Sequence, residues 1–293
     1  MVRAPRDFVL TALMRDTLRK DAAAHKYSHG HAMVFTGGLG RTGAARLAAR
    51  GALRIGAGLV SVAVPPDAVP EVACQITALM MRMVADTGDV RRVLADHRIN
   101  ALCIGPGFGV GPQQAAVLAA VLAAQRPCVL DADALTLLAQ EDAGLARLHP
   151  ACILTPHAGE FARLFPDLAQ RMPAVDHTEP AARTTRAQIL CAAAERAGCT
   201  VLLKGTDSLV AADAICWIHR SPEDGAMAWL ATAGSGDVLA GFVLGLLARG
   251  VAPVQAANMA VHLHGLAAQR FGAGLIAEDL PECLPAVFAD IGL

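Results

Sequence analysis

The sequence has few charged residues, few aromatic residues and no surplus of either charge. Charged residues make up 17% of its 293 residues and aromatic residues 4%, and 25 Lys and Arg balance 26 Asp and Glu. An electrostatic nucleic-acid platform needs a basic surface that displaces counterions, so this balance argues against one. The apolar content of 54% excludes disorder as the main state. A chain of this length is expected to bury a full core, in one large α/β domain or two small ones.

Long apolar runs are also absent. The longest, such as Ala115–Ala124 and Val238–Ala248, fall well short of the roughly 20 residues that a membrane-spanning helix needs. The N-terminus carries charges every few residues and has no apolar signal-peptide core. We therefore expect a soluble, cytoplasmic protein with no membrane partner.

Cysteine and histidine lack the spacings of disulfide or metal sites. The eight cysteines form no Cys-x-x-Cys pair, and several lie in apolar runs, as Cys103 and Cys152 do. Small buried thiols in a cytoplasmic protein explain this better than disulfides. The two His-x-His pairs, at 29–31 and 262–264, accompany no other metal-ligand spacing, so the sequence gives little support to a transition-metal site.

Short apolar runs alternate with longer Ala- and Leu-rich stretches. Most runs are continuously apolar, as in a parallel sheet covered on both faces. This order predicts a doubly wound α/β arrangement, in which ligands bind at the carboxyl ends of the strands. The predicted strands are Ala32–Thr36, Leu59–Val64, Ala101–Ile104, Cys128–Leu130, Cys152–Leu154 and Val201–Leu203. The predicted helices between them are Ala44–Ile55, Gln113–Ala124, Asp133–Ala139 and Arg186–Ala197.

The last third of the chain shows a different pattern. Ser208–Ala212 and Ala214–Ile218 predict a hairpin, and Asp237–Arg249 and Val254–Phe271 predict two long closing helices. Before them, Pro166–Thr185 is rich in Pro, Asp, Arg and Thr and is the best candidate for a loop or lid. No internal repeat, low-complexity tract or linker is apparent, which favours one domain.

The strongest local signal is the run AGSGDVLAG from Ala233 to Gly241, which leads into an apolar helix. Glycines let the backbone approach a ligand closely, and the first turn of a helix offers unpaired N–H groups to an anion. Asp237 would lie in that turn, where a bound phosphate repels it. One reason to place it there is to deprotonate a hydroxyl that attacks phosphorus. The alternative is that Asp237 caps the helix and the glycines only make a turn.

A second segment, TPHAGE at 155–160, directly follows a predicted strand. Thr155 is expected to cap the next helix with Pro156 in its first turn. His157 and Glu160 then share one face, so that an imidazole and a carboxylate lie where a ligand is expected. The alternative is that Glu160 only favours the helix N-terminus and His157 is a surface residue.

Four further segments stand at predicted strand ends. Lys204 would point its ammonium toward nucleotide phosphates, or belong to a simple turn. The glycine-rich segment 37–45 resembles a phosphate loop but has neither GxGxxG nor GK[ST] spacing. The glycines of 104–107 permit close backbone approach. Asp131 and Asp133 either hold Mg²⁺ through water or cap the next helix. Each signal is weak alone, and their shared position is what predicts a site.

The order of these motifs resembles the NAD(P)HX dehydratase family, a branch of the ribokinase-like superfamily. The matching pieces are HKYSHGHAMVFTGG, TGAARLAARGALRIGAGLVSVAVP, IGPGFG, VLDADAL, ILTPHAGEFARL, VLLKGTDSLVA, AGSGDVLAGF and AVHLHG, from about His25 to Gly265. The resemblance implies a ribokinase-like three-layer α/β sandwich, with a mostly parallel sheet covered by helices on both faces. It also implies a single domain at 25–293, preceded by a helical extension at 1–24.

The resemblance further implies a repair reaction. The S epimer of NADHX or NADPHX, hydrated at C6 of the nicotinamide ring, is returned to NADH or NADPH at the expense of ADP or ATP with Mg²⁺. Phosphorylation of the C6 hydroxyl turns a poor leaving group into a good one, and phosphate is eliminated. Bacterial relatives of this length generally use ADP, so ADP is the expected donor.

Two other functions compete with this one. The first is a small-molecule kinase of the same fold, acting on a hydroxymethylpyrimidine, thiazole or sugar. Sugar kinases usually carry Asn-x-x-Glu where this chain has His157-x-x-Glu160, which favours the dehydratase branch. The second is a non-catalytic nucleotide-binding protein.

The resemblance also implies roles for single residues. Asp237 would be the base, and Glu160 would orient Mg²⁺ through water. The anion hole would be formed by Gly234, Ser235 (more often Thr in the family) and Gly236. The hydrated nicotinamide nucleotide would be bound by Ala44, Gly107, His157 and Asp237. The adenine nucleotide would be bound by Lys204, Gly205, Thr206, Asp207, Ser208 and Gly236.

Two departures from the family pattern concern the N-terminal part. Many bacterial relatives carry an epimerase domain there, whereas only residues 1–24 precede the match, so a separate NAD(P)HX epimerase is the expected partner. The usual basic motif is replaced by Tyr27-Ser28-His29-Gly30, which raises the question of whether this loop takes part in the chemistry. Relatives form tetramers, so a homo-oligomer is also expected.

Overall fold

The computed structural model describes residues 4–141, 144–174, 179–221, 225 and 227–293. These residues form one ten-stranded sheet in the order β1-β10-β9-β8-β7-β6-β5-β2-β3-β4. All neighbours from β4 to β8 are parallel, whereas β9 is antiparallel to β8 and to β10. The carboxyl ends of the parallel strands therefore meet at one edge. The strands are β1 (Arg6–Asp7), β2 (His31–Phe35), β3 (Leu59–Val64), β4 (Met80–Met83), β5 (Ile99–Ile104), β6 (Cys128–Leu130), β7 (Cys152–Leu154), β8 (Thr200–Leu203), β9 (Ser208–Ala212) and β10 (Ile215–His219).

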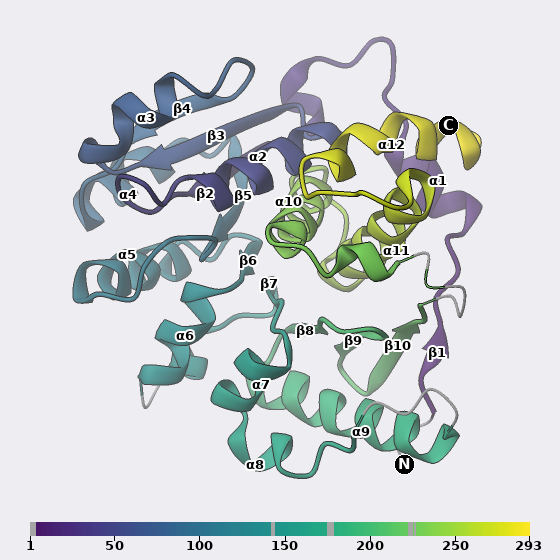
Figure 1. Cartoon of the computed structure of the whole chain (residues 1–293). Helices are drawn as coiled ribbons and strands as arrows, with labels where there is room; N and C mark the ends of the chain where they lie inside the picture. Colours follow the sequence, from purple (N-terminus) through teal and green to yellow (C-terminus); the bar gives the residue numbers. More distant parts are fainter. Residues whose placement is uncertain (1–3, 142–143, 175–178, 222–224, 226) are drawn as a thin grey trace.

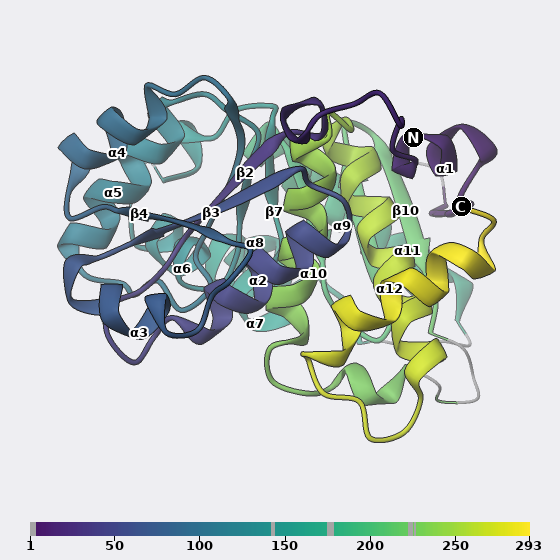
Figure 2. The ribbon, with the colours of Figure 1, turned by 90° about the horizontal axis from the view of Figure 1, so that it is seen from above.

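Helices cover both faces of the sheet, which confirms the predicted three-layer α/β sandwich (Figure 1, Figure 2). One layer consists of α1 (Ala12–Leu18), α2 (Gly43–Arg54), α3 (Val69–Ala73), α10 (Ser235–Ala248), α11 (Pro253–Phe271) and α12 (Asp279–Asp290). The other consists of α4 (Thr87–Leu94), α5 (Pro112–Ala123), α6 (Asp133–Gln140), α7 (Ala158–Leu164), α8 (Pro166–Ala169) and α9 (Pro180–Ala197).

The continuously apolar strands are explained by two separate hydrophobic cores. In β2, Ala32 and Val34 pack into the core under α2 and α10, whereas Met33 and Phe35 pack into the core under α5 and α6. Successive side chains of a strand point to opposite faces, so a sheet buried on both sides needs apolar residues at every position.

Helices α2 and α10 approach each other at the level of the backbone. A Cβ on Gly241 would lie 2.1 Å from the carbonyl oxygen of Ala48, and one on Gly245 would lie 2.6 Å from that of Ala52. The small residues therefore permit a contact that larger residues would prevent. This contact holds the first turns of α2 and α10 side by side at the carboxyl edge of the sheet.

Several helices and strands of the structure were not predicted from the sequence pattern. These are the edge strand β4, the short helices α3 and α4, and the helix α12, which follows the two expected closing helices. Strand β4 has four residues, is largely exposed, and its methionines are interrupted by Arg82, so it differs from the continuously apolar inner strands. Among the described residues, no helix combines the length and the apolar character that crossing a bilayer requires.

The loop predicted over Pro166–Thr185 is in part wrong. It contains α8, and α9 begins at Pro180, before the expected start at Arg186. In both helices Pro occupies the first turn, where its missing N–H costs nothing. Residues 175–178 of that segment lie outside the described residues, and nothing in the rest marks a lid.

Candidate active site

The glycine-flanked turn before α10 has the predicted form. Gly234 is the N-cap with φ +88°, and a Cβ there would lie 2.7 Å from Leu47 Cδ1 and 2.9 Å from the Cβ of Ala277. Only glycine fits both the conformation and the space. Asp237 lies in the first turn, as expected, and its Oδ2 lies 4.0 Å from the position of that Cβ. The carboxylate therefore folds back over the turn rather than into the core.

The side chain of Ser235 is hydrogen-bonded to the segment that precedes α10. Its hydroxyl donates to the carbonyl oxygens of Leu230 (2.7 Å) and Thr232 (3.1 Å). The hydroxyl thus holds the preceding segment against the turn, and Ser serves this purpose as well as Thr would. The N–H of Ser235 donates to the carbonyl oxygen of Thr232 (3.4 Å), so the following N–H groups in the first turn of α10 are the donors that suit an anion.

Lys204 ends β8 and reaches the same turn. Its Nζ donates to Asp131 Oδ1 at 2.7 Å, and it lies 3.4 Å from the position that a Cβ on Gly236 would take. Burial alone lowers the pKa of Lys204, but the carboxylates of Asp131, Glu160 and Asp237 together raise it above its ordinary value. The ammonium group therefore stays charged beside the first turn of α10.

The surroundings of Asp237 raise the pKa of its carboxyl group. Burial raises its pKa to about 6, assisted by the negative charge of Asp131, while Lys204 opposes the rise and Glu160 adds to it. A base with a pKa near 6 is ionised at neutral pH and accepts a proton more readily than an ordinary carboxylate.

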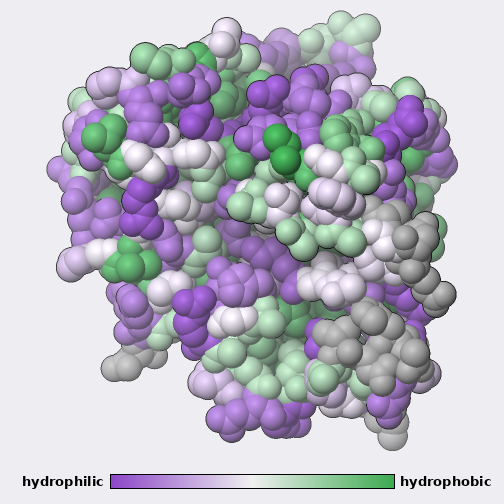
Figure 3. All heavy atoms as spheres, in the orientation of Figure 1, coloured by the Kyte–Doolittle hydropathy of each residue, from purple (hydrophilic) through white to green (hydrophobic). Residues whose placement is uncertain are grey.

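The surface of the molecule is hollowed near the centre of the face that is shown in Figure 3, and hydrophilic residues gather in this hollow.

Asp131 supports this arrangement from the end of β6. Its side chain is only 2% exposed, and it accepts hydrogen bonds from Lys204 and from the Thr155 hydroxyl (2.8 Å). The next residue, Ala132, has φ +46°, a conformation that costs a non-glycine residue on the order of 1–3 kcal/mol and is concentrated at functional sites. Asp133 instead accepts the N–H of Gly109 (2.7 Å) and pairs with Arg41 (3.3 Å).

His157 and Glu160 form a capping box, which corrects the expectation that Thr155 caps this helix. His157 is the N-cap of α7, and its Nδ1 accepts the N–H groups of Gly159 (3.0 Å) and Glu160 (3.3 Å). Glu160 Oε2 in return accepts the N–H of His157 (2.8 Å). Thr155 is bound to Asp131 instead, and Pro156 precedes the helix. The local signal for an N-terminus was right, but the cap lies two residues later.

The backbone brings His157 to Lys204. Residues 157 and 204 form a parallel β-bridge beyond the ends of β7 and β8, and the N–H of Lys204 donates to the carbonyl oxygen of Pro156 (2.8 Å). The expected neighbours His157, Lys204 and Asp237 thus lie in one region. The expected role of Glu160 toward Mg²⁺ stays a prediction, because its carboxylate serves the capping box.

Ala44 and Gly107 meet at the start of α2. Gly107 has φ +64°, and a Cβ there would lie 3.5 Å from that of Ala44 and 2.7 Å from the carbonyl oxygen of Arg41. One turn after Ala44, Leu47 packs against Gly234. Helix α2 therefore contacts Gly107 through Ala44 and the turn before Asp237 through Leu47, although these parts are far apart in the sequence.

The glycine-rich segment 37–45 does not offer its amides to a phosphate. Asp67 Oδ2 accepts the N–H of Leu39 (3.2 Å), and Glu71 Oε2 accepts the N–H of Gly40 (2.6 Å). Glu71 also accepts the hydroxyl of Thr42, and these hydrogen bonds lower its pKa. Two carboxylates already occupy donors that a phosphate loop would need to keep free.

The segment 204–208 has an exposed tip and a buried support. Gly205 and Thr206 are exposed, and Ser208 Oγ donates to the carbonyl oxygen of Gly205 (3.3 Å). Asp207 is buried and accepts the N–H of Ser221 (3.2 Å). Nucleotide binding by this segment stays a prediction, with Asp207 placed to hold the loop.

Comparison with known proteins decides the family. The sequence model described as NAD(P)H-hydrate dehydratase matches residues 32–284. The ADP-dependent (S)-NAD(P)H-hydrate dehydratase of Neisseria meningitidis is 37% identical over 268 residues, which cover 88% of this chain and 84% of that protein. This chain belongs to the NAD(P)H-hydrate dehydratase family.

Other members of the NAD(P)H-hydrate dehydratase family extend the comparison. The bifunctional NAD(P)H-hydrate repair enzyme of Moorella thermoacetica is 34% identical over 288 residues, which cover 93% of this chain and 52% of that protein. The chain spans about half the length of this and of other curated relatives that it matches. The ADP/ATP-dependent NAD(P)H-hydrate dehydratase of Bacillus subtilis, crystallised with ATP and Mg²⁺, matches 99% of both chains with a TM-score of 0.77 and 28% identity.

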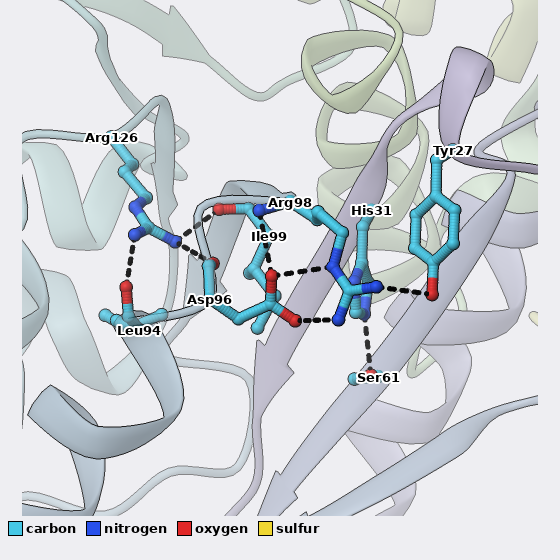
Figure 4. Close-up of polar contacts among 8 residues, drawn as sticks. All are labelled: Tyr27, His31, Ser61, Leu94, Asp96, Arg98, Ile99 and Arg126. Atoms are coloured by element: carbon cyan, nitrogen blue, oxygen red, sulfur yellow. Dashed lines mark hydrogen bonds and ion pairs between the residues drawn. The ribbon is translucent and has the colours of Figure 1, made fainter.

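The loop in which this dehydratase-family chain departs from the usual pattern lies at the opposite edge of the sheet. Residues 27–29 belong to a short 3₁₀ helix that precedes β2, and a Cβ on Gly30 would lie 1.8 Å from the carbonyl oxygen of Ala248, the last residue of α10. Asp237 is eleven residues earlier in that helix, about 16 Å away along its axis. Tyr27 accepts a hydrogen bond from Arg98 (3.2 Å) and joins a polar network there (Figure 4).

Sequence reasoning gave no role to one residue of the site. His264 on α11 is buried, and its Nε2 lies 3.0 Å from the carbonyl oxygen of Ser235. Burial lowers its pKa to about 4, so the ring is neutral and can donate through Nε2 to hold the turn. The AVHLHG motif contains His264, but nothing in its local pattern links it to a turn 29 residues earlier.

Proposed function

We propose that the protein converts the S epimer of NADHX or NADPHX to NADH or NADPH, driven by ADP or ATP. The carrying observation is the Asp237 carboxylate, with its pKa raised to about 6, folded over the glycine turn beside the Lys204 ammonium. Family membership supports the same reaction, since two curated relatives of similar length are ADP-dependent (S)-NAD(P)H-hydrate dehydratases.

Asp237 accepts the proton of the C6 hydroxyl as its oxygen attacks the terminal phosphorus of the nucleotide. The amides at the start of α10 and the Lys204 ammonium stabilise the negative charge of the phosphoryl group in transfer. The bond from phosphorus to the nucleotide breaks, which releases AMP from ADP or ADP from ATP. The C6–O bond then breaks with help from the ring nitrogen lone pair, C5 loses a proton, and phosphate leaves.

Substrate and nucleotide are proposed to bind on two sides of Asp237. Ala44, Gly107 and His157 would contact the hydrated nicotinamide nucleotide, and residues 204–208 with Gly236 would contact the adenine nucleotide. Two contacts support this division: Ala44 meets Gly107 one turn before Leu47, which packs against Gly234, and Lys204 reaches toward Gly236.

A magnesium ion fits this donor set when it arrives with the nucleotide. Mg²⁺ keeps several waters and needs only one or two carboxylates in addition to phosphate oxygens. Glu160 would hold it through water, since its buried carboxylate acts electrostatically on both Lys204 and Asp237. When bound, the ion neutralises negative charge on the phosphates.

The test is a repair assay with purified NADHX and NADPHX, run with ADP and with ATP in parallel in the presence of Mg²⁺. We expect recovery of the nicotinamide absorbance of NADH together with release of inorganic phosphate, fastest with ADP. A stable phosphorylated product without phosphate release would instead identify a kinase. No recovery with either nucleotide would contradict the proposal.

We also propose that the protein is a cytoplasmic homo-oligomer, a tetramer by resemblance, and works with an NAD(P)HX epimerase. Eight free cysteines, most of them buried, suit a reducing compartment. Exposed Met80 and Met83 on the edge strand β4 offer apolar surface to a second copy.

Sedimentation velocity measures the oligomeric state and tests the proposed assembly. Conversion of the R epimer only after an epimerase is added tests the partnership.

A further inference from the structure

A hollow of about 620 Å³ opens beside α2, next to the proposed substrate site. Gly43 lines it at one end, Leu47 lines its wall, and Glu278 borders it from the chain before α12. Leu47 and Ala277, which precedes Glu278, are also the two residues that pack against Gly234. The hollow and the Asp237 turn therefore share a wall. A volume of this size is typical of small-molecule sites.

The hollow carries a row of positive charge. Arg46, Arg50 and Arg54 line it and follow one another at four-residue spacing on α2, so that they lie on one face of the helix. Glu282 accepts hydrogen bonds from both Arg50 and Arg54, and Gln75 accepts one from Arg46 (3.2 Å). Glu282 thus balances part of the charge of Arg50 and Arg54, and Glu71 acts electrostatically on Arg46. Among the described residues that line the hollow itself, three arginines stand against one carboxylate, that of Glu278.

The guanidinium group of Arg46 does not use all of its hydrogen-bond donors. Its Nε is buried, and among the described residues that atom has no hydrogen-bond partner. The protein covers this atom, so a ligand in the hollow would meet the terminal nitrogens of the guanidinium group, of which Nη1 donates to Gln75. An arginine whose fork is only partly used is suited to a phosphate group.

The substrate site opens toward this hollow. The contact between Ala44 and Gly107 lies at the first turn of α2, and a Cβ on the neighbouring Gly43 would meet no atom within 4 Å. The space over Gly43 is therefore open. From Gly43 to Arg50 the helix rises by about 10 Å, on the scale of the pyrophosphate and ribose that separate the two bases of a dinucleotide.

A second hollow flanks the same contact but has the opposite charge. This second hollow has a volume of about 390 Å³, and Gly38 and Phe108 are among the residues that line it. Among the described residues of its lining, Asp67 is the one with a charged side chain. An anionic group is repelled by this carboxylate. Of the two hollows, the one beside α2 therefore suits the phosphate-bearing half of a dinucleotide.

We propose that the arginine row Arg46, Arg50 and Arg54 binds the adenosine half of the dinucleotide substrate, with Arg46 on its 2′-phosphate. This proposal rests on the proposed function for the identity of the dinucleotide. It makes NADPHX the preferred substrate, because NADHX lacks the group that Arg46 contacts.

The first test measures binding and needs no repair activity. Adenosine 2′,5′-bisphosphate and 5′-AMP are titrated calorimetrically into the full-length protein, with the nucleotide site saturated by a non-hydrolysable ATP analogue. We expect the bisphosphate to bind more tightly, and Arg46→Gln to weaken it about tenfold, as expected for a lost charge-assisted hydrogen bond. Arg91→Gln on α4, at the opposite face of the sheet, is the matched control and should change nothing.

Two binding results would overturn the proposal. One is equal affinity of the wild-type protein for the two probes. The other is a bisphosphate that binds through Arg46 but is not displaced by NADP⁺, since the hollow would then be a separate anion site. Either result leaves the repair assay untouched, so failure of the subsite is distinguishable from failure of the proposed function.

The second test uses turnover. With Arg46→Gln we expect KM for NADPHX to rise about tenfold with kcat within twofold, and KM for NADHX to change far less, because uniform binding energy is lost without effect on the reacting atoms. An equal rise of both KM values would contradict a contact with the 2′-phosphate.

Discussion

The two edges of the sheet use the same kinds of charged residue in opposite ways. At the amino edge, both carboxylate oxygens of Asp96 accept hydrogen bonds from Arg98 at 2.8 Å, and Arg98 also donates to Tyr27 (Figure 4). Arg126 donates to the carbonyl oxygens of Leu94, Asp96 and Ile99. The Arg98 guanidinium holds the pKa of Asp96 well below its usual range. Asp96, Arg98 and Arg126 thus all have hydrogen-bond partners within this network.

At the carboxyl edge the charges are buried and only partly compensated. Lys204 donates to Asp131, the carboxylates of Glu160 and Asp237 also act on it electrostatically, and burial raises the pKa of Asp237 to about 6. This difference indicates that charge pairing at the amino edge stabilises the fold, whereas the partly compensated charges at the carboxyl edge suit the proposed binding of phosphate-bearing ligands. The direction of the pKa shift separates the two edges: burial raises the pKa of Asp237 at the proposed site, whereas a charged partner lowers the pKa of Asp96 in the scaffold.

The largest expected effect is on turnover. Asp237→Asn removes the base, so kcat should fall about 10²–10⁴-fold, with nucleotide affinity kept or improved because a negative charge near the phosphates is gone. Steady-state repair kinetics and calorimetry measure the two quantities. The matched control is Asp96→Asn at the other edge, which should leave kcat within twofold. A loss of less than tenfold in the Asp237 variant would show that this carboxylate is not the base.

Replacement of a cationic side chain should lower the free energy of unfolding more at the carboxyl edge of the sheet than at the amino edge. Lys204→Met leaves Asp131 buried without its ion-pair partner, which should lower the free energy of unfolding by about 3 kcal/mol and weaken nucleotide binding. Arg98→Met removes an exposed pair and should cost less than about 1 kcal/mol. Urea unfolding gives both values. Equal costs would mean that the two edges do not differ in burial energetics.

Arg126 separates stability from activity. Arg126→Met removes the guanidinium donor from three carbonyl groups of the amino edge, of which that of Asp96 keeps a donor, the N–H of Ile99 (3.2 Å). The loss should cost about 2 kcal/mol, and Arg126→Lys should recover part of it. Because the network is far from Asp237, kcat of the folded protein should be unchanged in both variants. A fall in kcat without a fall in stability would connect this network to the chemistry.

The smallest effects are opposite in sign and depend on pH. The pKa of Asp237 is raised from 3.8 to about 6 in the folded state, so this group lowers the free energy of unfolding as the pH rises through this range. Asp237→Asn should therefore stabilise the protein at neutral pH, by about 1 kcal/mol after allowance for solvent screening. The pKa of Asp96 is lowered, so its stabilisation is present above its ordinary pKa and is lost in acid.

Calorimetric melting curves at several pH values test this contrast. At neutral pH, Asp237→Asn should raise Tm by about 2 °C and Asp96→Asn should lower it. The value of kcat/KM of the wild-type protein should fall as the pH drops through about 6. Shifts of the same sign for both variants would contradict the difference between the edges.

Much of the fold follows from local pattern, and much of the site does not. The apolar strands and the glycine turn at 233–237 are visible because burial on both faces and tight turns impose a local composition. The pairing of Asp131 with Lys204 joins residues 73 positions apart, which no local pattern encodes. The cap at His157 was missed for a different reason, since Thr155 is an equally good capping residue and only the tertiary bond to Asp131 excludes it.

Phosphorylation of the C6 hydroxyl is tested most directly by the fate of its oxygen. NADHX carrying a heavy oxygen isotope in that hydroxyl is turned over once with ADP, and the isotope is located by mass spectrometry. If Asp237 activates the hydroxyl for attack on phosphorus, the isotope appears in the released inorganic phosphate, because elimination breaks the C6–O bond. Isotope found in water instead would contradict phosphoryl transfer at this site.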